Sequence, residues 1–342
     1  MLAQAPVWIT EAEVVSLMDL GGAIEALEGG LFAEARGAAE NMVKTHAVWG
    51  HGHTLHAIGA TFPDAGFVGT KTWAHTEGGA TPLLILFDSQ NGSLRAVIEA
   101  FALGQMRTAS ASGVATRWLA APGADEFAII GTGKQALTQV AAVIAVRPIR
   151  RVRVFGRDRE RRARFADRVR SELQVEVMEA ATVQEALRSA PIITVVTRAT
   201  EPVIFADMLA RGAHVNAVGA IVPERAEIGQ DVLSRCTCIV ADSVPQAQKL
   251  SRELMEYFGL PDSPGWQRVR PLCEIVASRR SRASSDDVTL FKALGMGISD
   301  LSLGMEIYRK AVERGLGRRL ETPGKVPPRL RVSEPTQASQ RG

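Results

Sequence analysis

A glycine-rich segment near the middle of the chain has the spacing of a dinucleotide-binding turn. Gly131, Gly133 and Ala136 form G-x-G-x-x-A after an apolar run, and Thr132 and Gln135 complete the turn. In such a turn the first glycine allows a tight bend, the second lets the backbone approach a pyrophosphate, and the small third residue lets the next helix pack closely. The helix N-terminus offers free N–H groups to the phosphates. A turn without a ligand is the alternative, but the strand–turn–helix context favours a dinucleotide cofactor.

The end of the next strand-like run bears on which dinucleotide binds. In NAD-specific sites an acidic residue that binds the ribose hydroxyls usually ends this strand. Here Gly156 leaves room, and Arg157 could pair with a 2′-phosphate. Asp158 keeps NAD(H) possible, although it could instead cap the following helix. We therefore expect NADP(H) in preference to NAD(H).

Two cations stand out in the first third of the chain. Lys71 lies in "GTKTW", within an otherwise apolar strand-like run, and Arg107 precedes the small residues "TASASG". A lysine inside an apolar strand is costly unless it is paired or functional. The alternation around Lys71 also permits an outward side chain on a half-exposed strand, and Arg107 could be an ordinary surface arginine.

Most of the histidines also lie in this third. They are His46, His51, His53, His56 and His75. No Asp, Glu or Cys falls at an obvious ligand spacing beside them, so we expect no metal site. We expect His56 or His75 to line a polar pocket instead.

The chain beyond residue 126 alternates between strand-like and helix-like runs. Such alternation predicts βαβ units and a parallel sheet whose strands are apolar on both faces. The strand-like runs are 127–130, 152–155, 175–178, 192–197, 214–218 and 238–241, and helix-like runs such as 135–146 and 159–171 separate most of them.

The first third is predicted to be α+β with an antiparallel sheet. Thr10 and Glu13 can form a capping box at the start of a helical segment. The Asn91-Gly92 pair between two apolar runs predicts a hairpin. Residues 102–125 are predicted to form a helix of small residues, and residues 286–315 one long helical stretch.

The composition is that of an ordinary globular protein, with 342 residues, 46% of them hydrophobic and 23% charged. This length allows two domains of roughly 150 residues each. The net charge is only +3 and no basic stripe with interleaved aromatic residues is present, so we expect no nucleic-acid partner. The three cysteines suit free thiols in a reducing compartment. We see no signal-peptide pattern and no apolar run near ~18 residues, and so expect a cytoplasmic protein without a membrane partner.

Several segments, in order, resemble the ornithine cyclodeaminase/mu-crystallin family over roughly residues 10–320. They are "GTK" at 69–71, "GQMRTASAS" at 104–112, "IIGTGKQA" at 129–136, "TVVTRATEPV" at 194–203, "HVNAVGA" at 214–220 and "PERAEI" at 223–228. The resemblance implies a homodimer in which each subunit has a Rossmann domain and an α+β substrate-binding domain that also forms the dimer interface. We expect the substrate domain over 1–122, the Rossmann NAD(P)-binding domain over 123–295, a C-terminal helix returning to the substrate domain over 296–322, and a disordered tail over 323–342.

The resemblance also implies roles for individual residues. Lys71 matches the catalytic lysine and Arg107 the arginine that binds the substrate carboxylate, and Lys44 falls about where many relatives have a second carboxylate-binding residue. A guanidinium can hold a carboxylate through two hydrogen bonds, and an ammonium can donate a proton. The residues that match the nicotinamide wall are Thr197, Val218 and Gly219.

Ile221 departs from the pattern of part of the family. Cyclodeaminases and the related alanine dehydrogenase have an aspartate there, and an isoleucine can neither bind an ammonium nor act as a base. We therefore expect an NAD(P)H-dependent reductase of a small cyclic ketimine carboxylate, with Δ1-pyrroline-2-carboxylate or Δ1-piperideine-2-carboxylate as the type of substrate. His56 and Ile221 are expected to help set the pocket volume. A cyclodeaminase with a recycled cofactor, an amino acid dehydrogenase and a cofactor-binding protein without turnover are the alternatives.

Overall fold

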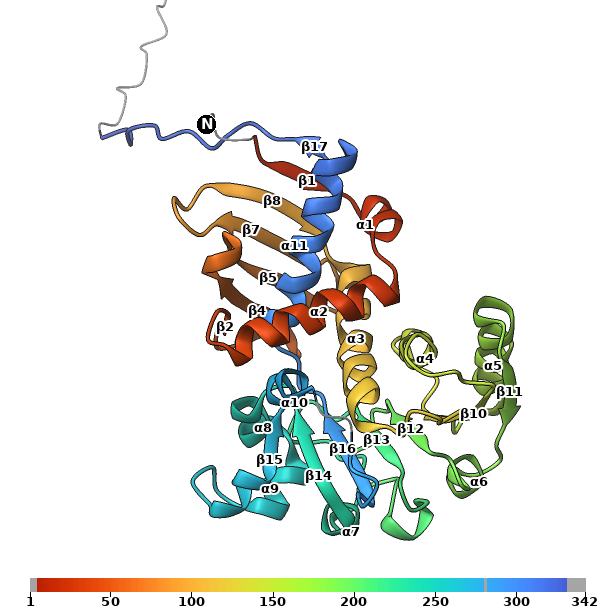
Figure 1. The fold of residues 1–342 in the computed structure, drawn as a ribbon. Helices are drawn as coiled ribbons and strands as arrows, with labels where there is room; N and C mark the ends of the chain where they lie inside the picture. The colour runs from red at the N-terminus through yellow and green to blue at the C-terminus, as the bar shows by residue number, and fades with distance from the viewer. Residues whose placement is uncertain (1–4, 280–281, 331–342) are drawn as a thin grey trace, which may run out of the picture.

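The computed structural model describes residues 5–279 and 282–330, which form two sheets with helices around them (Figure 1). The first sheet has the order β17-β1-β8-β7-β5-β4-β2, with β3 paired to β4 and β6 to β5. Its strands are β1 (Val7–Ile9), β2 (Glu40–Asn41), β3 (Thr45–Trp49), β4 (His53–Phe62), β5 (Phe67–Thr76), β6 (Gly79–Ala80), β7 (Leu83–Asp88), β8 (Leu94–Glu99) and β17 (Arg318–Arg319). The pairs are antiparallel except β1 with β8. The expected hairpin at Asn91-Gly92 is confirmed, since it joins β7 to β8.

Four helices belong to this part of the fold: α1 (Glu11–Leu17), α2 (Leu20–Ala35), α3 (Phe101–Leu119) and α11 (Gly297–Arg314). Helices α1 and α11 contact strands of the sheet, and α2 and α3 pack against α11. The capping box of α1 is confirmed, because Thr10 Oγ1 accepts from the backbone of Glu13 while the Glu13 side chain accepts from the backbone of Thr10. Helix α11 lies across one face, where it contacts β4, β5 and β7 as well as α2 and α3 (Figure 1). Helix α11, which follows the parallel sheet in the sequence, thereby packs with the first sheet.

The second sheet is parallel, with the order β11-β10-β9-β12-β13-β16-β14-β15. Its strands are β9 (Glu126–Ile130), β10 (Arg151–Phe155), β11 (Glu176–Glu179), β12 (Ile192–Val195), β13 (His214–Ala217), β14 (Cys236–Ala241), β15 (Val269–Pro271) and β16 (Val288–Lys292). Its helices are α4 (Ala136–Ile144), α5 (Arg159–Leu173), α6 (Val183–Leu187), α7 (Gln230–Arg235), α8 (Val244–Leu250), α9 (Arg252–Phe258) and α10 (Leu272–Ser278). The six expected strand runs are confirmed as β9 to β14. The expected fold, a Rossmann domain joined to an α+β domain, is confirmed.

The expected helical stretch over 286–315 is wrong in its first part. Val288–Lys292 forms β16, which lies between β13 and β14 in the middle of the parallel sheet. All five residues are buried, so a strand covered on both faces lacks the polar–apolar alternation that would have marked it. The helix begins only at Gly297.

The C-terminal tail is described only in part. Residues 323–330 carry no helix or strand, and 331–342 of the expected disordered tail lie outside the described residues. Within the described parts, no helix has both the length and the apolar character that a membrane crossing requires. The cytoplasmic location and the domain bounds given above stay predictions.

Candidate functional site

The glycine-rich turn lies at the carboxyl end of β9, in the middle of the parallel sheet. Gly131 has φ +115°, and a Cβ built on it would lie 2.5 Å from the Val196 carbonyl oxygen, so only glycine suits this position. A Cβ on Gly133, in contrast, would meet no atom within 4 Å. The space above Gly133 and the N-terminus of α4, which begins at Ala136, suit the close approach of a pyrophosphate.

A cavity of about 560 Å³ opens between this turn and the first domain. Parallel sheets of this class bind ligands outside the carboxyl ends of their strands. The cavity brings together eight of the residues singled out from the sequence: His75, Arg107, Gly133, Gln135, Thr197, Val218, Gly219 and Ile221. The expected cofactor turn, nicotinamide wall and substrate arginine therefore share one space.

Lys71 is paired inside the protein rather than exposed. It lies on β5 with 3% of its surface exposed, and its Nζ is 2.5 Å from Oδ1 of the fully buried Asp300 on α11. The Arg107 Nε lies 3.4 Å from the same oxygen. The Lys71 ammonium also lies over the ring of Trp73, 5.1 Å from its centroid. Among the described residues that line the cavity, Arg107 is present and Lys71 is not, and the two cations are connected by the carboxylate that they share.

The two lysines of the substrate side have lowered pKa values. Burial lowers the pKa of Lys71 to about 8, Asp300 partly opposes this effect, and Arg107 adds to it. Burial also lowers the pKa of Lys44; Arg107 adds to this shift, while Asp242 and Asp300 oppose it. Lys44 therefore belongs to the same electrostatic cluster as Lys71 and Arg107.

His56 lies in an aromatic stack across three strands. Its ring is 4.7 Å from that of Trp73 on β5 and 5.6 Å from that of His46 on β3, and its Nε2 is 2.9 Å from Thr54 Oγ1. Burial, with Lys44 nearby, lowers the pKa of His56 to about 4, so the ring is neutral at neutral pH. Among the described residues it is His75, not His56, that lines the cavity.

The end of β10 combines an exposed arginine with a helix cap. Asp158 Oδ1 accepts a hydrogen bond of 2.9 Å from the Arg161 backbone at the start of α5, and this bond lowers the pKa of Asp158. Arg157 is exposed. A Cβ on Gly156 would lie 2.9 Å from Thr132 Cγ2, so the glycine lets β10 approach the cofactor turn.

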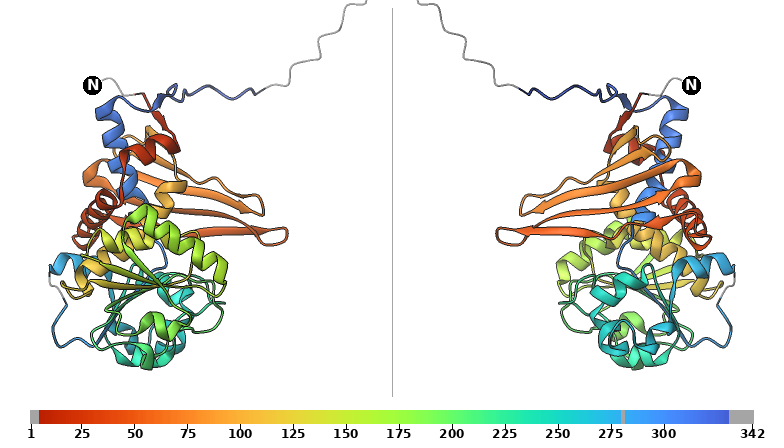
Figure 2. Two further views of the ribbon diagram at one scale, coloured as in Figure 1. Left: turned by 90° about the vertical axis from the view of Figure 1, so that its right-hand side faces the viewer. Right: turned by 90° about the vertical axis from the view of Figure 1, so that its left-hand side faces the viewer.

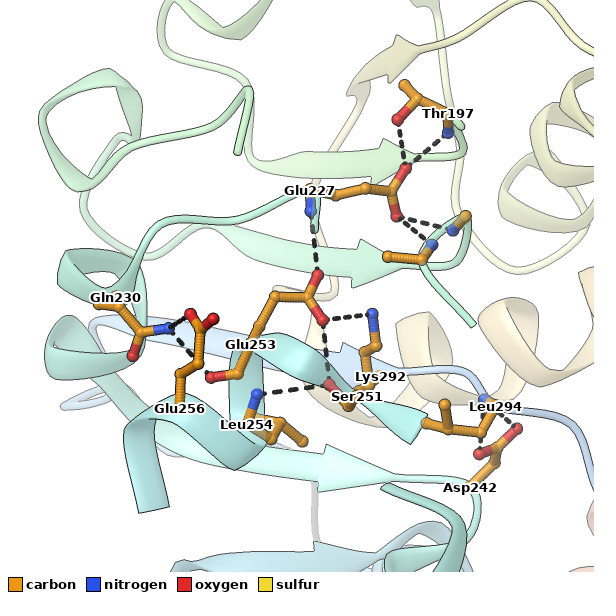
Figure 3. A network of polar contacts seen from close by, with 12 residues as sticks. Thr197, Glu227, Gln230, Asp242, Ser251, Glu253, Leu254, Glu256, Lys292 and Leu294 are labelled. Carbon is orange, nitrogen blue, oxygen red and sulfur yellow. Dashed lines mark hydrogen bonds and ion pairs between the residues drawn. The ribbon is translucent and has the colours of Figure 1, made fainter. Parts of the chain in front are cut away.

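Glu227 connects the two loops of the expected nicotinamide wall (Figure 3). Its Oε1 accepts from the backbone N–H of Thr197 at 2.5 Å and from its hydroxyl at 2.8 Å. Its Oε2 accepts from Gly219 at 2.7 Å and from Ala220 at 3.0 Å. Burial raises the pKa of Glu227, and nearby Lys292 opposes this shift. One carboxylate thus holds the ends of β12 and β13 together.

Asp242 binds the backbone of the loop after β16, which lines another part of the cavity (Figure 3). Its carboxylate accepts from Leu294 at 2.9 Å and from Gly295 at 2.7 Å. Gly295 has φ +91°, and a Cβ there would lie 2.8 Å from Arg107 Nη1. The loop after β16 is therefore fixed directly against the guanidinium of Arg107.

Asp300 and Asp242 were missed in the reading of the sequence. A signal exists for Asp300, because it is the one charged residue in "GISDLSLGM" at 297–305, where a helix of small and apolar residues must be buried. Asp242 directly follows β14, whose last three residues are buried, and sheets of this class place functional groups at the carboxyl ends of their strands. No group of three or more His, Cys, Asp or Glu able to hold a metal ion occurs among residues 5–279 and 282–330.

Comparison with known proteins agrees with this geometry. A curated Δ1-pyrroline-2-carboxylate reductase from Bacillus cereus is 33% identical over 70% of this chain and 74% of its own length. The ketimine reductase mu-crystallin of Rattus norvegicus is 34% identical over 66% of this chain and 68% of its own. The solved Δ1-pyrroline-2-carboxylate reductase of Thermococcus litoralis, in complex with NADH and L-proline, has a TM-score of 0.84 at 26% identity and covers 92% of this chain and 100% of its own.

A sequence model built for a whole protein family also matches this chain, over a longer stretch than the single relatives do. It spans residues 6–315 and so includes the first sheet except its edge strand β17, the cofactor turn and helix α11. Its agreement with the order of the motifs and with the arrangement of the two sheets shows that the chain belongs to the ornithine cyclodeaminase/mu-crystallin family.

Proposed function

We propose that this protein is an NAD(P)H-dependent reductase of a cyclic ketimine carboxylate of the Δ1-pyrroline-2-carboxylate or Δ1-piperideine-2-carboxylate type. One observation carries the proposal: Arg107 lines the same cavity as Gly133 and Gln135 of the dinucleotide turn, and it shares the Asp300 carboxylate with Lys71. An anion binder and a proton donor beside a cofactor site are what the reduction of such a carboxylate requires. The named relatives act on substrates of this class.

The residues of the chain divide the chemistry between them. The bound nicotinamide would supply the hydride that reaches the imine carbon. Arg107 would bind the substrate carboxylate and fix the face that the imine presents. The Lys71 ammonium would protonate the imine nitrogen, so that a Nζ–H bond breaks and an N–H bond forms. The neutral amine of Lys71 then regains a proton from solvent.

Ile221 supports reduction over cyclodeamination. It lines the cavity with 37% of its surface exposed. Cyclodeamination must handle a second amine and several proton transfers, for which an acid/base carboxylate is useful. Asp242, also in the cavity wall, already accepts backbone hydrogen bonds. Ketimine reduction needs no further acid/base group.

We propose NADP(H) as the preferred cofactor, with NAD(H) as the alternative. Arg157 is exposed at the end of β10 and can reach a 2′-phosphate, for which a guanidinium is well suited. The Asp158 carboxylate already caps α5, which makes it less available to ribose hydroxyls.

We propose a homodimer formed through the first sheet. The face opposite α11 carries half-exposed apolar side chains of neighbouring strands, namely Val68, Ile85, Phe87 and Val97. The hairpin of β3 and β4 projects from the body of the molecule (Figure 2). Val48 and Trp49 of β3 are exposed. A second copy of the chain would cover this surface, since contiguous apolar patches on soluble proteins commonly mark interaction sites.

The direct test uses the purified protein with NADPH or NADH. Each cofactor is mixed with Δ1-pyrroline-2-carboxylate or Δ1-piperideine-2-carboxylate, and the absorbance of the reduced cofactor is followed. We expect oxidation of the cofactor and formation of L-proline or pipecolate. Ammonia release from ornithine without a net change in cofactor would establish cyclodeamination instead. Failure to oxidise either cofactor with any cyclic imine would refute the reductase.

A further inference from the structure

One buried carboxylate contacts both cations of the substrate side. Asp300 Oδ1 lies 2.5 Å from Lys71 Nζ and 3.4 Å from Arg107 Nε. Its Oδ2 is buried and has no hydrogen-bond partner among the described residues. A buried carboxylate is costly unless cations compensate it, so this site needs both partners in place.

The packing of α11 determines where Asp300 lies. A Cβ on Gly297 would come within 1.8 Å of the Gly59 carbonyl oxygen, so the first turn of the helix lies directly against β4. Asn41 Oδ1 accepts from the Ile298 backbone at 2.9 Å and fixes the same turn. Asp300 is in this first turn, where the helix dipole favours a negative charge. The carboxylate is thereby held between β5 and α3.

We propose that Asp300 is a positioning residue for the proton transfer: it keeps Lys71 as an ammonium beside the substrate and holds Arg107 by its Nε so that the outer nitrogens face the substrate carboxylate. This inference rests on the proposed ketimine reduction. Asp300 itself forms no bond to substrate.

The charges around Lys71 explain why it needs this partner. Arg107 of α3 and Lys44 before β3 are cations that favour the neutral amine, as burial does, and Asp300 of α11 opposes all three effects. On β5 and β4 its neighbours Trp73 and Ile58 are uncharged. Without the carboxylate, Lys71 would lie among cations and release its proton at a lower pH.

The position of the Arg107 guanidinium is constrained as well. Its Nε faces Asp300, and its Nη1 lies against Gly295, where no side chain fits. The guanidinium is thus held at one edge by a charge and at another by backbone. Loss of the charge would free the side chain and weaken the binding of the substrate carboxylate.

The test is the variant Asp300→Asn, compared with the wild type and with Glu306→Gln, which removes a carboxylate from an outer position of the same helix. Initial rates with NADPH and Δ1-pyrroline-2-carboxylate give kcat and KM across pH values on both sides of the Lys71 pKa. In Asp300→Asn we expect the basic limb of kcat to move toward acid by about 1–3 pH units. At about pH 8 the protonated fraction of Lys71 would fall roughly 5–500-fold over this range of shifts, and we expect a matching loss of kcat that is recovered in part in acid. Glu306→Gln should follow the wild type.

A second readout does not depend on turnover. In protein with 13C at the lysine Cε, the Lys71 signal is assigned by its loss in Lys71→Met, and its titration is followed by NMR. We expect Asp300→Asn to lower the titration midpoint of Lys71. Asp300→Glu keeps the negative charge and provides a second test if Asp300→Asn does not fold. We expect this variant to keep the titration midpoint of Lys71 and to raise the KM for the imine.

The outcomes separate this inference from the proposed function. An unshifted Lys71 midpoint in folded Asp300→Asn, or a loss of rate that is equal at all pH values, would overturn the role of Asp300. A wild-type protein that does not reduce the imine refutes the proposed function, while the NMR titration still decides whether Asp300 controls the charge of Lys71.

Discussion

Glu227 holds Thr197 by two hydrogen bonds to one oxygen, from the backbone N–H at 2.5 Å and from the hydroxyl at 2.8 Å. The second oxygen of the same carboxylate accepts from Gly219, in the loop of the neighbouring strand. Thr197 and Gly219 both line the cavity. Glu227 does not line the cavity, but it determines the shape of the cavity wall at which we expect the nicotinamide to bind.

Replacement of Glu227 by Gln should loosen this wall. The amide keeps the shape but turns an NH2 group toward backbone donors, which leaves buried N–H groups without an acceptor. We expect a loss of about 1–3 kcal/mol in the free energy of unfolding and a weaker affinity for the reduced cofactor. Urea unfolding and fluorescence titration measure the two effects. Glu256→Gln, at the outer edge of the same network, is the control, and equal behaviour of the two variants would contradict the role of Glu227.

The motifs of the proposed cofactor site stand out in the sequence because each depends on local chain geometry. The turn from Gly131 to Ala136 is one example, since its glycines are needed whatever lies elsewhere in the fold. Asp300 is the opposite case. It meets Lys71 only because α11 returns to the first sheet, and its distance along the chain from Lys71 gives no hint of this contact.

Strand β16 could not be predicted from the sequence either, because it is buried on both faces. Its all-buried residues Val288–Lys292 could equally belong to a buried helix, and the lysine that ends it favours neither form. The pairing of Lys292 with Glu253 at 2.9 Å becomes visible only once the sheet is assembled. The sequence pattern can therefore mark single buried polar residues, but it cannot predict which of them meet when the elements pack together.

His214 should make the protein sensitive to acid. Its ring is fully buried between Thr289 Oγ1 and Asn216 Oδ1, and burial lowers its pKa to about 3. The unfolded chain binds a proton near pH 6.5 and the folded protein does not, so stability is lost as the pH falls below about 6.5 toward 3. The slope from this group approaches about 1.4 kcal/mol per pH unit. Urea unfolding of the wild type and of His214→Gln checks this, with His53→Gln as control; an equal pH slope in all three would refute it.

Arg157→Ala should separate the two cofactors. If the guanidinium binds the 2′-phosphate, its loss should raise the Kd of NADPH about 10–100-fold, the equivalent of a charge-assisted hydrogen bond of about 1.5–3 kcal/mol. The Kd of NADH should change little. Arg161→Ala, which removes an exposed arginine in the first turn of the following helix α5, is the control. Equal changes for NADPH and NADH would remove the basis for NADP(H) preference.

Phe87→Glu should disrupt the proposed dimer. The substitution places a charge on the apolar face of the first sheet, next to Val68 on the paired strand. Light scattering coupled to size exclusion should show a dimer for the wild type and a monomer, or a strongly concentration-dependent mixture, for the variant. Val15→Glu changes an exposed apolar residue on α1 and should leave the mass unchanged. A wild-type monomer, or a dimer that survives Phe87→Glu, would place the interface elsewhere or exclude it.

The two glycines of the cofactor turn should respond differently to alanine. In Gly131→Ala the new Cβ meets the Val196 carbonyl oxygen at a positive φ, so we expect a loss of stability of about 1–3 kcal/mol. In Gly133→Ala the Cβ meets no atom within 4 Å, so the fold should be as stable as the wild type. The same Cβ would occupy the space that we assign to the pyrophosphate, and the Kd for NADPH should rise at least about tenfold. Thermal unfolding and cofactor titration of both variants distinguish the two roles, and a Gly133→Ala protein with unchanged affinity would show that the cofactor phosphates lie elsewhere.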